Sequence, residues 1–184
     1  IYYSSNILDI GNDRLKFKYK IDNKNAFFES DESQLINDKL YYKGDISFDP
    51  FYFNTNIVLE KFDIVKFLKN NSTFNEFIKS GLLFNDNISG TLSLKSNNLA
   101  KNKLFTSLDA LINVKNGEIN FDKSKIANSK IGEIVLNYSK LEQENNEVIF
   151  KGSFKYIINN QEGFNRFFQR YKKNRILINN IYFD

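Results

Sequence analysis

The sequence predicts a mainly β fold: one extended, curved antiparallel sheet with about three short helices, in a single domain over residues 1–184. Residues 107–122, SLDALINVKNGEINFD, place Asn116-Gly117 between two alternating runs, and both central residues of a type I′ hairpin turn need positive φ. The run from Leu15 to Ile21 alternates apolar and polar residues, as a half-buried strand does. A glycine followed by apolar residues two and four positions later recurs at Gly44, Gly90, Gly117, Gly132 and Gly152. The recurrence fits one strand type used repeatedly, and equally it fits glycines that begin strands after turns.

The Asn-Gly turn sets the register of its hairpin. The expected pairs are Lys115 with Glu118, Val114 with Ile119, and Ile112 with Phe121. In this register one face of the hairpin is apolar and the other is polar, with Leu111 as the exception. A shift of one residue would exchange the two faces, so turn chemistry and side-chain pattern support the same pairing.

The first half of the chain reads as strands interrupted by two short helices. Strands are expected at residues 1–10, 15–21, 26–30, 39–49 and 51–60, with turns at 11–13 and 22–25 and a loop at 31–38. A helix is expected at residues 63–69. A second helix follows, because Thr73 and Glu76 form a capping-box pattern and Gly81 lies where that helix would end.

The second half returns to strands at residues 88–95, in the hairpin, and at 126–138, 148–158 and 176–183, with loops at 97–103 and 142–146. A last helix is expected from Gln161 to Lys173. It carries an aromatic stripe, Phe164, Phe167, Phe168 and Tyr171, opposite a basic side. Packing of the stripe on the sheet is the favoured interpretation. The alternative is contact with an anionic membrane surface, for which the candidate residues are Arg166, Arg170, Lys172 and Lys173.

Composition argues against catalysis and against a cofactor. The chain has no His and no Cys, which excludes the common nucleophilic triads and ordinary zinc sites. Neither a Gly-rich phosphate loop nor a carboxylate pair in contrasting environments is evident. We therefore expect a non-enzymatic protein without metal or cofactor. The 26 basic and 22 acidic residues make a mixed surface. Alternation separates Lys16, Lys18 and Lys20 from the neighbouring aromatics, so we expect no nucleic-acid partner.

An apolar sheet face of this extent needs more cover than three short helices provide. Hydrocarbon needs only apolar contact and no specific polar partner, so an uncovered concave face is suited to acyl chains. The candidate groove residues are those with firm alternation: Leu92, Leu94, Ile112, Val114, Ile119, Phe121, Phe154 and Tyr156. For each of them, ordinary core packing is an equal alternative. A different class of function, a scaffold domain that binds a protein partner by pairing at an exposed edge strand, is also open.

The order of segments resembles AsmA-like proteins. Residues 56–68, NIVLEKFDIVKFL, resemble the strand and leucine-aspartate helical turn of that family, and LLFNDNISGTLSLKS at 82–96 resembles its "sGxLsL" strand. Residues 108–126 and 131–136 are similar to the following strands, so the likeness covers about residues 39–184. The resemblance implies a periplasmic protein of a Gram-negative bacterium, anchored in the inner membrane outside this segment. It also implies phospholipid transport or outer-membrane maintenance, as for TamB-like and YhdP-like relatives, with envelope protein partners and no catalytic residue.

No secretory signal or membrane span is evident in the sequence. The chain begins at Ile1 and ends on a strand-like run, and from this we expect a segment of a longer AsmA-like protein.

Overall fold

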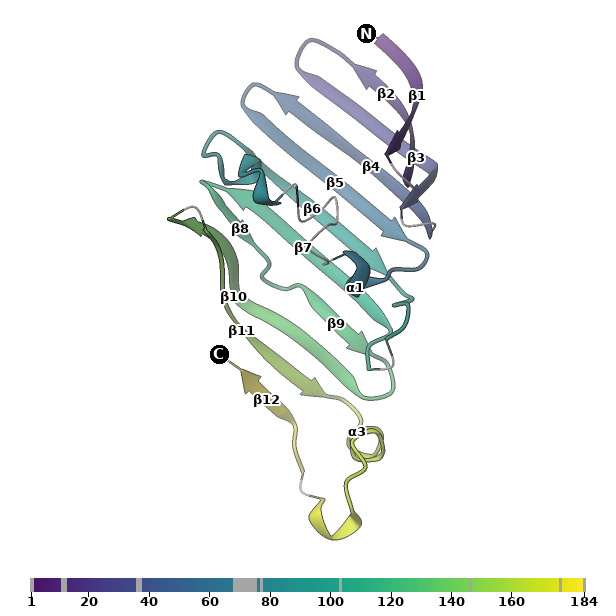
Figure 1. Ribbon diagram of the computed structural model, residues 1–184, viewed down its shortest axis with the longest axis vertical. Helices are drawn as coiled ribbons and strands as arrows, with labels where there is room; N and C mark the ends of the chain where they lie inside the picture. The colour runs from purple at the N-terminus through teal and green to yellow at the C-terminus, as the bar shows by residue number, and fades with distance from the viewer. Residues whose placement is uncertain are drawn as a thin grey trace.

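The computed structural model describes residues 2–10, 13–35, 38–67, 76, 78–102, 104–145, 147–175 and 177–183. These residues form one twelve-stranded sheet with short helices at its margins (Figure 1). The strands are β1 (Tyr2–Ile10), β2 (Asp13–Ile21), β3 (Asn25–Leu35), β4 (Asp38–Phe48), β5 (Phe51–Leu59), β6 (Ser89–Ser96), β7 (Ser107–Lys115), β8 (Glu118–Asn120), β9 (Lys125–Asn128), β10 (Gly132–Glu144), β11 (Glu147–Ile158) and β12 (Asn180–Phe183). The helical elements are α1 (Ile64–Phe67), η1 (Leu82–Phe84), α3 (Gln161–Phe167) and η2 (Lys172–Asn174).

Strand order follows chain order. The sheet runs from β1 to β8, then β10, β11 and β12, while β9 pairs with both β7 and β10. The mainly β fold is therefore confirmed. All pairs are antiparallel except β5 and β6, which are parallel, so the sheet is mixed and not wholly antiparallel as expected. Parallel pairing requires residues 60–88 to return along the sheet before β6 begins.

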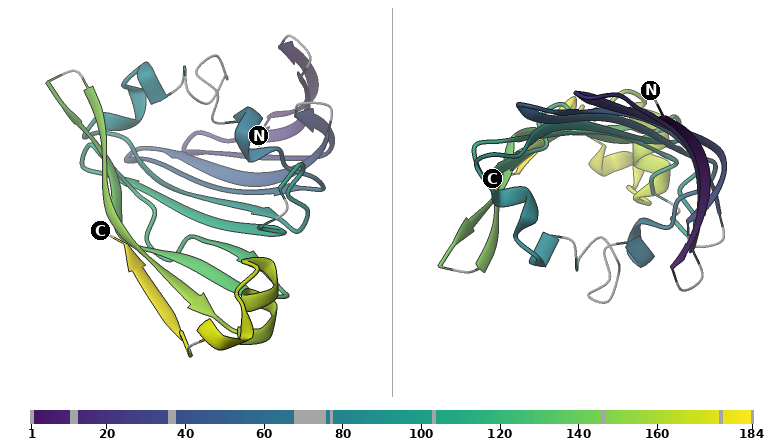
Figure 2. Two further views of the ribbon diagram at one scale, coloured as in Figure 1. Left: turned by 60° about the horizontal axis from the view of Figure 1, so that its bottom comes forward. Right: turned by 90° about the horizontal axis from the view of Figure 1, so that it is seen from above.

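The sheet arches, and its helical elements lie on the concave side. Figure 2 shows α1 and the segment that ends in η1 beneath the arch, near opposite ends of the strands, with α3 at the C-terminal end of the sheet. Side chains from α1 and from residues 78–84 pack against the same face of the sheet, which agrees with that view. This concave face is the one that the apolar halves of the alternating strands form.

The Asn-Gly hairpin forms with the expected turn. Asn116 and Gly117 have φ of 52° and 70°, as a type I′ turn requires. Lys115 pairs with Glu118 and Val114 with Ile119, but β8 ends at Asn120. The expected pairing of Ile112 with Phe121 is wrong, because β8 ends at Asn120 and the Ser124 hydroxyl then bonds the backbone of Leu111. Beyond this point β9 replaces β8 as the partner of β7.

Three expected loops or strands differ from the structure here. Residues 31–35 and Asp38 are not in a loop: β3 continues to Leu35 and β4 begins at Asp38, because the end of β3 pairs with β2 at Gln34 and with β4 from Ser33 to Leu35. The expected strand at residues 126–138 is two strands, β9 and β10, joined by a tight turn. In this turn the Asn128 side-chain oxygen accepts a hydrogen bond from the Lys130 amide. Residues 142–144, expected in a loop, belong to β10.

The last helix is shorter than expected. α3 ends at Phe167, and η2 follows as a separate turn. Gln169 has φ of 51°, a left-handed conformation that a continuous α-helix does not admit. In the first half, Gly81 has φ of 74° and ends the second helical segment as predicted, whereas Thr73 and Phe74 of that segment lie outside the described residues.

Candidate functional site

The concave face is built by alternation along each strand. In β2, Phe17 and Tyr19 project to this face, and Lys18 projects to the opposite one. Residues paired directly across an antiparallel ladder lie on the same face of the sheet. Tyr19 pairs with Phe28 of β3, and Phe28 pairs with Gly44 of β4, so all three lie on the concave face. The same rule extends the apolar face across the whole sheet.

Two glycines allow aromatic rings to lie across the neighbouring strand. A Cβ atom on Gly90 would lie 2.4 Å from Cδ1 of Phe53, and one on Gly44 would lie 2.6 Å from Cζ of Phe28. Any larger residue at either position would displace the ring. Of the five recurring glycines, Gly90 and Gly132 lie at strand starts and Gly117 lies in the turn before β8, whereas Gly44 and Gly152 lie inside strands. Close packing explains the two interior positions.

Two buried clusters border the concave face at opposite ends of the strands. The first lies beneath α1 and is formed by Leu40, Leu59, Phe62, Leu94 and Leu99, with Ile64 and Phe67 of α1 packed against it. The second is formed by Ile78, Val114 and Ile119, with Leu83 and Phe84 packed against it. These two clusters are the well-packed core of the middle of the sheet, and the face between them has less cover.

The eight candidate groove residues divide into two groups by burial. Leu94, Val114, Ile119 and Tyr156 are buried within clusters, so they are core residues. Half-buried side chains on the same face form the second group: Leu92, Ile112, Phe121 and Phe154. Leu92 pairs with Ile112 directly across the β6–β7 ladder, midway between the two clusters. The concave face thus has packed margins and a partly open middle.

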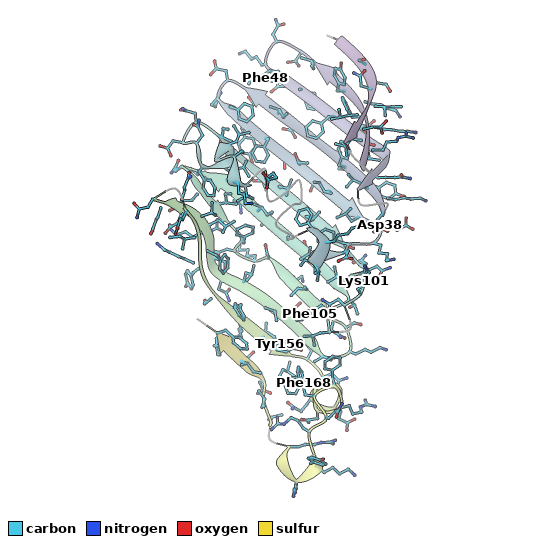
Figure 3. The ribbon with its side chains drawn as sticks, in the orientation of Figure 1. Asp38, Phe48, Lys101, Phe105, Tyr156 and Phe168 are labelled. Atoms are coloured by element: carbon cyan, nitrogen blue, oxygen red, sulfur yellow. The ribbon has the colours of Figure 1, made fainter. Side chains whose placement is uncertain are left out.

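The C-terminal end of the concave face is closed by the protein itself. Ile131, Tyr156 and Phe164 of α3 form a third buried cluster, in which the rings of Tyr156 and Phe164 are 6.1 Å apart. Figure 3 shows Tyr156 on β11 near α3. The Tyr156 hydroxyl is buried without a hydrogen-bond partner among the described residues, and burial raises its pKa. This end is therefore packed with aromatic and aliphatic side chains.

The N-terminal end of the concave face is open. A depression of about 470 Å³ is lined there by Phe17, Tyr19, Phe28 and Tyr42, with Asn6 and Ala26 among its other lining residues. The Tyr42 hydroxyl donates to the Lys16 carbonyl at 2.9 Å, and burial raises the pKa of Tyr42. These lining residues were not among the sequence candidates. The alternation in β2 is the sequence feature that points to Phe17 and Tyr19. By itself it predicts a half-buried strand and does not predict a depression.

The opposite face is polar, and it also has depressions. One of about 670 Å³ and one of about 420 Å³ lie over β2–β5, lined by a mixture that includes Lys18, Glu29, Lys43 and Asn56. Both signs of charge are present, so neither depression selects an ion of one sign. The separation of lysines from aromatics that was predicted for β2 agrees with its register, in which Tyr19 pairs with Phe28 and Lys18 with Glu29, and no lysine is among the described residues that line the concave depression.

A chain of ion pairs runs across β8, β10 and β11 on the polar face. Lys140 lies 2.7 Å from Glu118 and 2.7 Å from Glu142, and Lys151 contacts both Glu142 and Glu144. Hydrogen bonds from Lys140 and Lys151 lower the pKa of Glu142 to about 2. The charges alternate in sign and are hydrogen-bonded to one another, so the arrangement links β8, β10 and β11.

The four basic candidates for a membrane surface lie at the C-terminal end of the molecule. Arg166 belongs to α3, Arg170 to the connection after it, and Lys172 and Lys173 to η2. Of the aromatic stripe, only Phe164 is buried. The expectation that the whole stripe packs on the sheet is therefore wrong, because the helix ends before the stripe does.

The comparisons with known proteins identify no relative: no family model, curated protein or solved structure matches this chain. The resemblance to AsmA-like proteins stays a prediction. Among the described residues, no three acidic, His or Cys side chains gather closely enough to hold a metal ion. In the same residues, no helix combines the length and apolar character needed to cross a bilayer.

Proposed function

We propose that the protein is a non-enzymatic, AsmA-like lipid-binding module of the bacterial envelope, in which the concave face holds phospholipid acyl chains. The periplasmic location and the anchor outside this segment belong to the same proposal and come from the resemblance. The observation that carries the proposal is the partly open apolar middle of the concave face. Leu92 lies there paired with Ile112, which also packs against the second cluster, and half-buried Phe17 and Phe28 continue the apolar surface at the N-terminal end of the face.

The dimensions of this face suit an acyl chain. Neighbouring strands are about 4.8 Å apart, so the six strands from β2 to β7 span roughly 24 Å. A bilayer core of about 30 Å accommodates two chains end to end, which gives about 15 Å for one chain. A chain lying across the strands would contact mainly apolar side chains between the two buried clusters, with Thr55 beside Leu92 as a polar exception. It would need no specific polar partner there.

The chemistry of the face favours lipid over a polar small molecule. Binding sites for polar ligands combine apolar walls with a few convergent polar groups. On the described concave face, the polar atoms at the N-terminal end are engaged within the protein: Asn6 donates to the Tyr19 hydroxyl at 3.2 Å, and the Tyr42 hydroxyl donates to backbone. Burial of apolar surface is therefore the main source of binding free energy that this face offers to a ligand.

Native mass spectrometry after gentle purification tests the proposal. Wild-type protein is expected to carry phospholipid, or to take it up from added vesicles. Leu92→Lys puts a charge into the middle of the concave face and should abolish loading. Val58→Lys puts the same charge on an exposed position of the opposite face and should leave loading unchanged. Wild-type protein that neither carries nor takes up lipid would refute the proposal, as would equal loading of both variants.

A second candidate is a scaffold that adds a partner strand to an open edge. Among the described residues, β1 runs for 9 residues and pairs only with β2, and β12 covers β11 only from Phe154 to Ile157. Open edges of this length are templates for strand addition. In this case purified protein would be free of lipid and would bind an envelope protein saturably, and proline substitutions in β1 would abolish that binding.

A further inference from the structure

The segment that follows α3 projects beyond the sheet as a compact loop. Figure 1 places it at the end of the long axis of the molecule, below β11 and β12. We name the last two residues of α3 and the described residues after it, 166–175 and Leu177, the basic tip. The base of the tip is anchored: Phe164 is buried, and the Gln161 side-chain oxygen accepts a hydrogen bond from the Ile178 amide at 3.1 Å. The tip is therefore held in one orientation relative to the sheet.

The basic tip exposes large apolar side chains. Tyr171 is 75% exposed and Leu177 is 77% exposed, and Phe167 and Phe168 are 41% and 46% exposed. The rings of Phe167 and Phe168 contact each other at 5.2 Å, in an edge-to-face arrangement, and Figure 3 shows Phe168 at the side of α3. Four exposed large apolar residues within one short segment are more than scattered surface positions, and such a concentration is typical of a surface that another phase or molecule covers.

The charge of the basic tip has one sign. It carries five positive charges, on Arg166, Arg170, Lys172, Lys173 and Arg175. No Asp or Glu occurs between Gly163 and Phe183. All of these side chains are exposed except Arg170, which is half-buried. The rest of the chain mixes both signs, so the concentration of positive charge here is local. Basic residues around exposed aromatic and aliphatic residues match the interface of an anionic bilayer, where rings enter the headgroup layer and cations meet phosphates.

We propose that the basic tip docks on the surface of an anionic lipid bilayer. The four exposed apolar side chains, Phe167, Phe168, Tyr171 and Leu177, would enter the interfacial layer. The five cationic side chains would contact the lipid headgroups. Docking would present the C-terminal end of the concave face to the membrane. This inference does not depend on the acyl-chain proposal, because a peripheral contact needs no lipid inside the protein.

Vesicle co-sedimentation tests the docking. One set of vesicles is phosphatidylcholine, and in the other part of it is replaced by phosphatidylglycerol. Wild-type protein should bind the anionic vesicles, and binding should fall as salt screens the charges. Lys172→Glu with Lys173→Glu should reduce the partition coefficient by roughly 30-fold or more, the factor expected for the loss of two surface cations. Tyr171→Ser with Leu177→Ser should also reduce binding, with every charge retained.

The control changes net charge by the same amount elsewhere. Lys24→Glu with Lys61→Glu alters two exposed lysines outside the basic tip and should leave binding unchanged. All substituted positions are exposed, and circular dichroism of each variant checks that the fold is retained. The proposal fails if wild-type protein does not co-sediment with anionic vesicles, or if the control variant loses as much binding as the tip variants do. It also fails if the protein binds soluble heparin but no vesicle, which would indicate an acidic macromolecule as the partner.

Discussion

The hydroxyl of Ser124 hydrogen-bonds the backbone of Leu111 at a position where a residue of a neighbouring strand would normally do so. It accepts a hydrogen bond from the Leu111 amide at 2.9 Å and donates one to the Leu111 carbonyl at 3.0 Å. β8 has ended and β9 has not yet begun at this point, so one side chain satisfies both backbone groups of β7. Ser33 does the same for Lys16 across the β2–β3 irregularity, at 2.8 and 2.9 Å. Buried serines thus preserve the sheet where strands break register.

Replacing Ser124 with alanine should destabilise the protein by about 2 kcal/mol, because a buried backbone group without a partner costs about 1–3 kcal/mol. The measurement is the free energy of unfolding in urea. Ser129→Ala, at an exposed turn position nearby, is the matched control and should change it by less than about 0.5 kcal/mol. Equal effects of the two substitutions would mean that water replaces the serine hydroxyl without loss.

Gly117→Val should destabilise the β7–β8 hairpin by at least about 1–2 kcal/mol, the cost of a left-handed conformation for a residue with a Cβ atom. Gly117 has φ of 70°, and an added Cβ would lie 2.9 Å from the Phe84 carbonyl oxygen. Asn116→Gly keeps the turn and should be close to neutral. A shift of the urea midpoint by Gly117→Val no larger than that of Asn116→Gly would contradict the type I′ turn.

Tyr156→Phe should leave the stability unchanged or raise it. The hydroxyl is buried without a partner among the described residues, so its removal deletes a desolvated polar group and keeps the ring packed against Phe164. Tyr156→Ala, which removes the ring, should cost about 3–5 kcal/mol as for other large aromatic truncations. A loss of more than about 1 kcal/mol for Tyr156→Phe would reveal a hydrogen-bond partner for the hydroxyl.

Leu59→Ala should cost about 2–5 kcal/mol, because Leu59 is 2% exposed in the cluster beneath α1. Leu92→Ala should cost about 1 kcal/mol, since Leu92 is already half-buried and lies between the clusters. Thermal or urea unfolding of the two variants measures the difference directly. Similar losses would indicate that the middle of the concave face is packed as tightly as its margins.

The ion pairs around Glu142 should make stability depend on pH at both extremes. The pKa of Glu142 is lowered from 4.5 to about 2, so its contribution is full above pH 4.5 and is lost as pH falls toward 2. Hydrogen bonds to Glu118 and Glu142 raise the pKa of Lys140 above 10.5. Its contribution is therefore full below pH 10.5 and is lost only at higher pH.

Unfolding of wild type and Glu142→Gln, compared from pH 2 to neutral pH, checks the acid side of this dependence. The stability difference between them should be constant above about pH 4.5 and should disappear toward pH 2. Glu60→Gln removes an exposed carboxylate just after β5, outside the chain of ion pairs, and is the matched control. A wild-type advantage that persists unchanged at pH 2 would mean that Glu142 is not the titrating group.

Local signals predicted much of the sheet. The Asn116-Gly117 turn and the alternation in β2 could be read directly, because a type I′ turn depends on two residues and a strand face depends on neighbours two positions apart. Gly81 also ended its helical segment as expected. The polar residues 31–35 were misread as a loop, since strand pairing on both sides of β3 outweighed their weak apolar pattern.

The candidate site could be predicted only in part. Alternation correctly placed Leu92 and Leu94 on the same face, but it could not tell that Leu94 is core and Leu92 is half-open. That difference depends on where α1 packs, far from β6 in sequence. The aromatic stripe after Phe164 was misread for a similar reason, because the left-handed Gln169 ends the helical periodicity that placed all four rings on one side.

The sequence by itself determined the strand identities, the turn at Asn116-Gly117 and the polarity of the two sheet faces, because each depends on residues close together in the chain. Only the tertiary structure decided the parallel pairing of β5 with β6, the burial of Val114 and Ile119, and the exposure of Tyr171. These features depend on contacts between segments far apart in sequence. Their free energy comes from area removed from water between the segments, which no local pattern records.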